Sequence, residues 1–210
     1  VADGMGGHQA GDVASREAVE TIEHQLLNSV LDVSTEKKKE VLLKAIGKAN
    51  EKVYTLSLDN PKLQGMGTTV IASIINKKEV VLGHVGDSRA YLLHNGNLYQ
   101  LTVDHSYVEF LKKHGQITEE EAENHPQRNM ILRAVGTNEE VEVDLVNTPW
   151  YQGDVVLLCS DGLTTMIDEN EIGNILTRSI PLEEKADTLL TSALNAGGKD
   201  NISLILLINT

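Results

Sequence analysis

Aspartates that follow apolar, strand-like runs are the feature that most restricts how this chain can fold. The first is Asp3, which is followed by the run Gly4-Met5-Gly6-Gly7. Because glycine has no Cβ, the backbone C=O and N–H groups of this run can closely approach a ligand that also contacts the Asp3 carboxylate. A single such motif also fits a surface turn. Its repetition favours one shared site, and the further copies are Gly86-Asp87-Ser88, Ser160-Asp161-Gly162 and Lys199-Asp200-Asn201.

Composition limits the classes of protein that the chain can belong to. With 210 residues, 40% of them hydrophobic, it can form one substantial core, and we expect a single domain over residues 1–210. The net charge of −13 argues against nucleic-acid binding. No apolar run is long enough to cross a bilayer, so we expect no membrane insertion. The single cysteine, Cys159, lies in an apolar run and is expected to be buried, in a reducing, cytoplasmic setting.

The start of the chain is unusual. Residue 1 is Val1, not methionine, and Val1-Ala2 has the character of the end of a buried strand. We therefore expect that the earlier part of this strand is missing from the sequence.

Helical periodicity predicts a pair of amphipathic helices in the first part of the chain. Apolar residues recur at helical spacing from residue 12 to 26 and from about 36 to 56. The run Lys37-Lys38-Lys39 is interpreted as a solvated face of the second helix. His8 is interpreted as a polar residue that caps the first helix.

Strand patterns follow over residues 68–75, 80–85 and 90–94, and Asn95-Gly96 is a strong hairpin signal. Later strands are expected at 141–147, 155–159 and 202–208. The last of these is apolar on both faces and is therefore expected to be central in its sheet. Consecutive strands joined by tight turns must be antiparallel.

Shorter helices are expected between the strands. One covers about 107–114, and another begins at Thr118, whose capping box is completed by Glu121. Residues 125–130 are predicted to form an irregular loop. A second helix pair begins at Asp168 and at Leu182. Hairpin strands with helices in pairs predict an α+β fold, in which antiparallel sheets are covered by helical layers.

If the four strand-end aspartates converge, the carboxylates must repel one another, and without a cation at least one would be protonated. Oxygen ligands without a histidine or cysteine partner select Mg²⁺, Mn²⁺ or Ca²⁺ over Zn²⁺. Two such ions about 3.5–4 Å apart are the usual arrangement for displacement at phosphorus. The sequence therefore indicates a metal-dependent phosphate chemistry.

Seven ordered motifs resemble the metal-dependent serine/threonine phosphatases of the protein phosphatase 2C type, and most of all their bacterial branch. The resemblance implies a four-layer α-β-β-α sandwich of two antiparallel sheets flanked by helix pairs. It also implies hydrolysis of phosphoserine and phosphothreonine by a metal-activated bridging water, without a phosphoenzyme. The motifs are Val1-Ala2-Asp3-Gly4-Met5-Gly6-Gly7-His8, Gly65-Met66-Gly67-Thr68-Thr69, His84-Val85-Gly86-Asp87-Ser88-Arg89, Asp104-His105-Ser106, His125-Pro126-Gln127-Arg128-Asn129, Ser160-Asp161-Gly162-Leu163 and Asp200-Asn201-Ile202.

The same resemblance implies the roles of individual residues. Asp3 would bridge two Mn²⁺ or Mg²⁺ ions, and the carbonyl of Gly4 would bind one of them. Asp161 and Asp200 would complete the other, which makes Asp3, Asp161 and Asp200 the catalytic set. Asp87, with Asp161, matches a third and weaker metal site. Residues 118–137 correspond to a mobile flap that affects substrate choice.

Two departures from the family pattern stand out. Eukaryotic relatives have a histidine, proposed as general acid, directly after the Asp-Gly pair, and here this position is Met5. The family's phosphate-binding arginine and one acidic metal ligand would lie in the N-terminal segment that we expect to be missing.

Two other functions are compatible with the same residues. One is a catalytically silent relative that binds phosphoproteins as a regulatory module, and the other is a phosphatase of small phosphate esters.

By resemblance the partners are phosphorylated proteins, including a serine/threonine kinase of the same bacterium and its targets, and we expect a monomer. His84, His105 and Arg89 could orient the motif aspartates or only hold turns.

Overall fold

The computed structural model describes residues 1–27 and 33–210, except for the side chain of His8. The chain forms a mixed helix and sheet structure in which every strand pair is antiparallel. The helices are α1 (His8–Leu27), α2 (Thr35–Asp59), the 3₁₀ turn η1 (Pro61–Leu63), α3 (Tyr107–Lys113), α4 (Glu119–Glu123), α5 (Asp161–Thr164), α6 (Glu169–Leu176) and α7 (Leu182–Asn195). The strands are β1 (Gly4–Met5), β2 (Gly67–Thr68), β3 (Val70–Ile75), β4 (Glu79–Val85), β5 (Arg89–His94), β6 (Asn97–Gln100), β7 (Asp144–Pro149), β8 (Val155–Cys159) and β9 (Leu204–Ile208).

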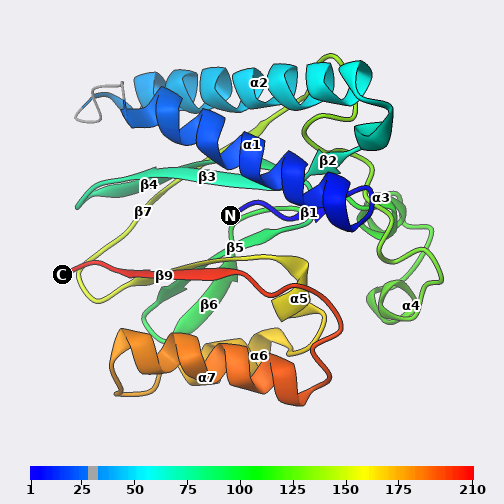
Figure 1. Cartoon of the computed structure of the whole chain (residues 1–210). Coiled ribbons are helices and arrows are strands. Elements are labelled where there is room, and N and C mark those ends of the chain that lie inside the picture. The colour runs from blue at the N-terminus through cyan, green and yellow to red at the C-terminus, as the bar shows by residue number, and fades with distance from the viewer. Residues whose placement is uncertain (28–32) are drawn as a thin grey trace.

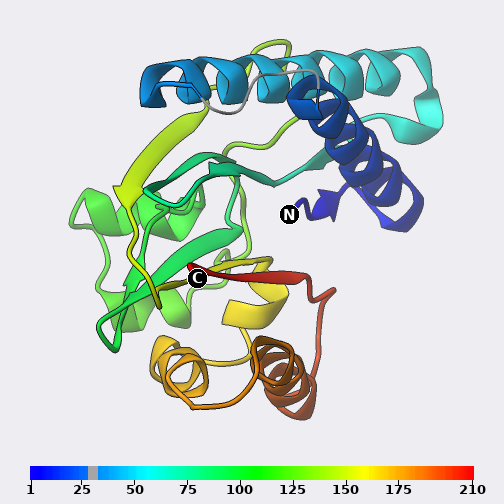
Figure 2. The same cartoon turned by 90° about the vertical axis from the view of Figure 1, so that its left-hand side faces the viewer.

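The strands form a three-stranded sheet, β3-β4-β7, a four-stranded sheet, β6-β5-β8-β9, and the short pair β1-β2. In Figure 1, α1 and α2 lie on the outer side of the first sheet, and α6 and α7 lie on the outer side of the second. Figure 2, turned by 90°, shows the same separation, with the N-terminus between the two halves. The prediction that Val1-Ala2 ends a buried strand holds only for the pairing: the backbones of Val1 and Ile71 exchange two hydrogen bonds of 2.9 Å, but both residues are only partly buried and lie before the first strand, β1.

Alternating side chains divide the apolar interior into three clusters. On β4, Val81 packs with α1 and α2, whereas Leu82 packs between the sheets. On β8, Leu157 packs with α5, α6 and α7, whereas Leu158 packs between the sheets. Each sheet therefore buries both of its faces, and the cluster shared by the two sheets holds their strand ends at a common rim.

Several local predictions are confirmed by backbone geometry. Asn95 (φ 49°) and Gly96 (φ 78°) form the tight turn between β5 and β6. The capping box of α4 is present, since Thr118 and Glu121 satisfy each other's backbone N–H groups. Asp168 caps α6 by accepting a 2.8 Å hydrogen bond from Glu171 N. The first helix begins at His8, whose side chain lies outside the described part, so its capping role stays a prediction.

The prediction of a central position for the last strand is wrong. β9 covers Leu204–Ile208 and lies at the edge of its sheet, paired only with β8 among the described strands. Leu206 packs toward the α6 and α7 side, and Leu207 packs between the sheets. A strand between two packed layers is apolar on both faces at an edge as well as in the centre, so the pattern does not report position. The strand predicted at 141–147 is displaced, because β7 covers Asp144–Pro149.

The interpretation of Lys37-Lys38-Lys39 as a solvated face is wrong for Lys38. Its side chain is only 1% exposed, and its Nζ lies 2.7 Å from Glu79 Oε1. Glu79 also accepts a 2.7 Å hydrogen bond from Thr35 Oγ1. This buried pair attaches the start of α2 to the start of β4.

No helix in the described part of the chain is both long and apolar enough to cross a membrane.

Replacement of Glu79 by alanine is expected to destabilise the fold more than replacement of Glu40, which forms an exposed ion pair with Lys37. Glu79→Ala leaves the Lys38 ammonium buried without its carboxylate, which costs about 3 kcal/mol of unfolding free energy. Glu40→Ala breaks the exposed Lys37–Glu40 pair and should cost less than about 1 kcal/mol. Urea denaturation measures both losses, and equal values would contradict the assignment of a buried pair. Because the hydrogen bond from Lys38 lowers the pKa of Glu79, this stabilisation is lost as the pH falls through the folded-state pKa of Glu79.

Candidate metal centre

All four aspartates that the sequence singled out lie directly before or after strands or in the segments that connect them. Asp3 directly precedes β1, Asp87 lies between β4 and β5, Asp161 begins α5 directly after β8, and Asp200 lies in the segment before β9. Their carboxyl groups are close enough to act on one another. Asp3 interacts with Asp161 and Asp200, and Asp87 interacts with Asp161 and Asp3. The structure therefore brings together the four aspartates that the sequence singled out.

Burial and mutual repulsion disfavour the charged forms of these groups. Burial, then Asp161 and Asp200, raises the pKa of Asp3 to about 7. The pKa of Asp87 is raised to about 7, first by burial and then by the charge of Asp161. Asp87 is only 8% exposed. The pKa of Asp161 is also raised, first by burial and then by the charge of Asp200. Asp200 is exposed, and its Oδ1 accepts a 2.8 Å hydrogen bond from Asn201 N.

The donor set fits a divalent cation in its chemistry. The carboxyl groups of Asp3 and Asp161 act on each other, and burial first and neighbouring carboxyl groups next raise the pKa of both. Carboxylate oxygens are ligands of hard divalent cations, and a cation would remove the repulsion that contributes to these raised pKa values. As they stand, no three or more His, Cys, Asp or Glu side chains of the described residues are arranged to hold one ion.

Ser160, which directly precedes Asp161, joins the segments that carry Asp161 and Asp200. Ser160 N donates to Ser203 O at 2.9 Å, and Ser203 N donates to Ser160 Oγ at 3.0 Å. Ser160 Oγ in turn donates to Asn201 O at 3.1 Å. Because Ser160 and Asn201 are direct neighbours of the two aspartates, these contacts place Asp161 beside Asp200.

Two glycines let Asp3 approach the site. The backbones of Gly4 and Gly11 touch where the chain crosses from β1 to the first turn of α1, and a Cβ on Gly11 would lie 2.7 Å from Gly4 O. Side chains at either position would force β1 away from α1. The close crossing fixes the backbone of Gly4, and with it the position of Asp3.

His105 holds the loop that carries Asp87. Its backbone N donates to Gly86 O at 2.8 Å, and its Nδ1 accepts from Gly86 N at 3.0 Å. Its Nε2 lies 2.9 Å from Arg133 Nη1 and 3.2 Å from Asp144 Oδ2. The suggestion that His105 orients a motif aspartate is thus supported through Gly86.

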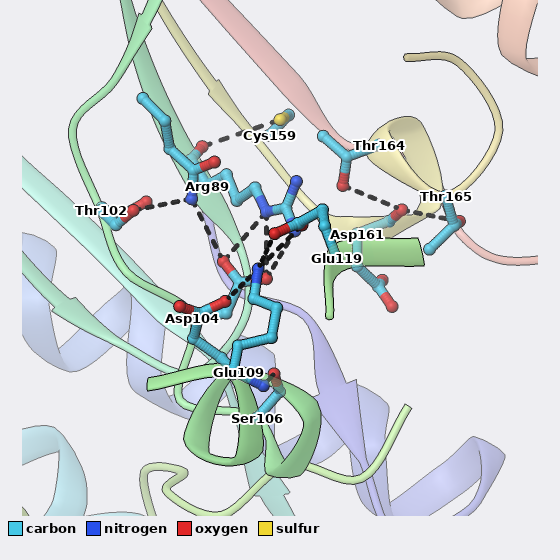
Figure 3. Close-up of polar contacts among 12 residues, drawn as sticks. Arg89, Thr102, Asp104, Ser106, Glu109, Glu119, Cys159, Asp161, Thr164 and Thr165 are labelled. Atoms are coloured by element: carbon cyan, nitrogen blue, oxygen red, sulfur yellow. Dashed lines mark hydrogen bonds and ion pairs between the residues drawn. The ribbon is translucent and has the colours of Figure 1, made fainter. Parts of the chain in front are cut away.

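Arg89 and His84 have other surroundings. Arg89 is bound to Asp104 by two short hydrogen bonds, Nε–Oδ1 at 2.9 Å and Nη2–Oδ2 at 2.7 Å, as Figure 3 shows beside Asp161. Sequence reasoning did not find this pair, although both residues lie in the quoted motifs. The ring of His84 is fully buried against His105, with a centroid distance of 4.7 Å. Burial lowers the pKa of His84 to about 4, so this ring is neutral at pH 7.

The helices α3 and α4 belong to an excursion that leaves and returns beside His105. Tyr107 N donates to Met130 O, and Leu132 N donates to His105 O. Within the excursion a hollow of about 510 Å³ is lined by residues 124–130. None of the four aspartates lines it, so it is separate from the carboxylate rim.

Known proteins resemble this chain over nearly its whole length. The family described as Protein phosphatase 2C matches residues 1–198. The serine/threonine phosphatase stp of Listeria welshimeri is 46% identical over 206 residues, which are 98% of this chain and 82% of that protein.

Solved structures agree with the sequence comparison. Serine/threonine phosphatase Stp1 from Staphylococcus aureus has a TM-score of 0.93 at 37% identity, and the match covers 99% of this chain and 81% of that one. The catalytic domain of the serine threonine protein phosphatase PstP, in complex with 2 manganese ions, has a TM-score of 0.86 at 36% identity, covering 98% of this chain and 84% of that one.

A side chain at Gly11 is expected to disturb the site without removing any carboxylate. Gly11→Ala overpacks the crossing with Gly4 and should cost about 1–3 kcal/mol of unfolding free energy. Gly47 is the matched control, because it also lies within a helix and a Cβ there meets no atom within 4 Å. Gly47→Ala should be neutral or gain up to about 1 kcal/mol from helix propensity. Denaturant unfolding of both variants tests the close approach, and a neutral Gly11→Ala would contradict it.

Proposed function

Because this chain belongs to the protein phosphatase 2C family, we propose that it hydrolyses phosphoserine and phosphothreonine on proteins, with Mn²⁺ or Mg²⁺ as its cofactor. It is a metal-dependent protein serine/threonine phosphatase of the bacterial branch. The observation within the chain that carries this function is the convergence of Asp3, Asp161 and Asp200 at one rim.

The ligands of two ions are proposed to be the carboxylates of Asp3, Asp161 and Asp200 and the carbonyl of Gly4. Asp3 interacts with Asp161, Asp200 and Asp87, which supports its proposed role as the ligand shared by the two ions. Asp87, with Asp161, is proposed to hold a third and weaker ion. Two divalent ions in this place supply an activated water and neutralise charge on the phosphoryl oxygens.

The chain's own residues define the surroundings of that chemistry. Asp3 and Asp161 would hold the cations through buried carboxylate oxygens that otherwise repel each other. Gly4 offers only its backbone, and the crossing with Gly11 keeps that backbone in place. Met5 follows Gly4, and its thioether has no proton to give to the leaving group.

A cysteine-dependent route does not fit this chain. Cys159 is fully buried, as its sequence surroundings predict, and burial raises the pKa of its thiol to about 12. A nucleophilic cysteine needs a lowered pKa and access to substrate.

The whole of residues 1–210 is proposed to be one catalytic domain with a four-layer α-β-β-α arrangement. Its support is the division of the interior into a helix–sheet, a sheet–sheet and a second sheet–helix cluster. We further propose a monomer, and a location in the cytoplasm because the single cysteine is a buried thiol. Its partners are proposed to be a serine/threonine kinase and the proteins that this kinase phosphorylates.

Asp161→Asn is expected to lower kcat by about 10²–10³, taking the loss of one transition-state stabiliser as a guide. The assay is hydrolysis of a phosphothreonine peptide by the full-length protein in Mn²⁺. Asp168→Asn is the matched control, because it removes the same charge while asparagine still caps α6. Near-complete activity of Asp161→Asn would remove Asp161 from the proposed metal ligands.

Chelation is expected to abolish activity reversibly. Excess EDTA should leave almost no hydrolysis of the phosphothreonine peptide, and added Mn²⁺ or Mg²⁺ should restore it, because the rim then regains its cations. A small ester such as p-nitrophenyl phosphate, assayed in parallel, distinguishes protein from small-molecule substrates. Full activity in EDTA is the result that would end the two-metal proposal.

A further inference from the structure

Two buried hydroxyl groups meet beneath the carboxylate rim. Thr69 Oγ1 lies 2.7 Å from Ser88 Oγ, and the two residues are 1% and 0% exposed. Thr69 lies between β2 and β3, whereas Ser88 lies between β4 and β5. The contact therefore joins the residue before β3 to the connection that leads from β4, in the same sheet, to β5 in the other sheet.

Asp3 is attached to the same pair through its backbone. Its N–H donates to Thr69 Oγ1 at 2.9 Å, and its C=O accepts from Thr69 N at 2.9 Å. Thr68 Oγ1 donates to the same carbonyl at 2.9 Å. Of the groups that bind the Asp3 backbone, only Thr69 Oγ1 also forms a hydrogen bond with Ser88.

Ser88 directly follows Asp87, so the contact ends at the second carboxylate segment. Gly86, on the other side of Asp87, packs so closely on Thr69 that a Cβ would lie 2.7 Å from Thr69 Cβ. With φ of 109°, Gly86 also has a backbone conformation that side chains disfavour. The Asp87 loop therefore rests on Thr69 through a hydroxyl contact and through direct packing.

The two segments joined in this way carry groups that repel each other. Asp3 adds to the raised pKa of Asp87, after burial, Asp161 and Asp104, and no described Lys or Arg forms an ion pair with either Asp3 or Asp87. Hydrogen bonds between uncharged groups can hold two carboxylates near each other without neutralising their charge, which is left for a cation. The hydrogen bonds from Asp3 N to Thr69 Oγ1 and between Thr69 Oγ1 and Ser88 Oγ join only uncharged groups.

We propose that Thr69 is a positioning residue, whose hydroxyl, together with that of Ser88, fixes Asp3 relative to the Asp87 loop and thereby sets the affinity of the rim for divalent cations. This inference rests on the proposed function, since it concerns the same metal ligands. Residues that orient ligands from behind typically change metal affinity about 10–100-fold when they are replaced.

Thr102 provides a matched control for a purely structural role. Its hydroxyl accepts a 3.1 Å hydrogen bond from Ala90 N, and the residue is 3% exposed. This resembles the hydrogen bond from Asp3 N to Thr69 Oγ1. Among the described residues, however, no hydrogen bond of the Thr102 hydroxyl reaches the four aspartates, and Figure 3 shows Thr102 on the far side of Arg89 from Asp161. Replacement of either threonine by valine preserves shape and leaves one buried N–H without its acceptor.

The experiment compares Thr69→Val with Thr102→Val in the full-length protein. Mn²⁺ binding is measured by isothermal titration calorimetry, and unfolding by denaturant is measured in EDTA. We expect similar losses of stability, but a 10–100-fold weaker Mn²⁺ affinity only for Thr69→Val. Thr69→Ser, which restores the hydroxyl, should return the affinity to within about twofold of the starting protein.

Ser88→Ala keeps the acceptor for Asp3 N but removes the connection to the Asp87 loop, so it should also weaken Mn²⁺ binding. If Thr69→Val does not fold, Ser88→Ala and Thr69→Ser decide the question. Unchanged Mn²⁺ affinity in Ser88→Ala, or equal affinities in Thr69→Val and Thr102→Val, would overturn the inference. Failure of the unsubstituted protein to bind Mn²⁺ or to hydrolyse the phosphopeptide would instead overturn the proposed function.

Discussion

Repulsion among buried carboxyl groups is the constraint on which the rest of the site depends. Asp3, Asp87 and Asp161 all have raised pKa values, because each is buried and each lies near other aspartates. Among the ion pairs of the described residues, none includes a carboxylate of this rim. The nearby cation Arg89 is taken up by Asp104. A positive charge from outside the chain is therefore the natural complement of this rim, in agreement with the metal-dependent chemistry of the family.

Neutral contacts hold the rim together. Ser160 joins the segments of Asp161 and Asp200, and His105 holds the loop of Asp87 through Gly86. Hydrogen bonds between backbone and small polar side chains fix position without neutralising charge. These hydrogen bonds leave the carboxylate oxygens available for cations, so the site is preorganised for metal binding.

The position of the rim follows from the packing of the two sheets. Leu82 on β4 and Leu158 on β8 belong to the apolar cluster between the sheets, while their neighbours face the helices. This alternation fixes the register of each strand, because a shift by one residue would exchange its two faces. Aspartates at the ends of β4 and β8 are therefore placed as firmly as the strands themselves.

Local chemistry was readable from the sequence, whereas the pairing of distant segments was decided by tertiary structure. The aspartates at strand ends, the Asn95-Gly96 turn and the cap at Asp168 depend on residues within a few positions, so their patterns predicted them. The ordered motifs also identified the family. Lys38 with Glu79, Arg89 with Asp104 and Thr69 with Ser88 join residues far apart or on different elements, and no local pattern selects one partner among many. The edge position of β9 has the same origin, since its apolar residues report two covered faces but not the number of neighbouring strands.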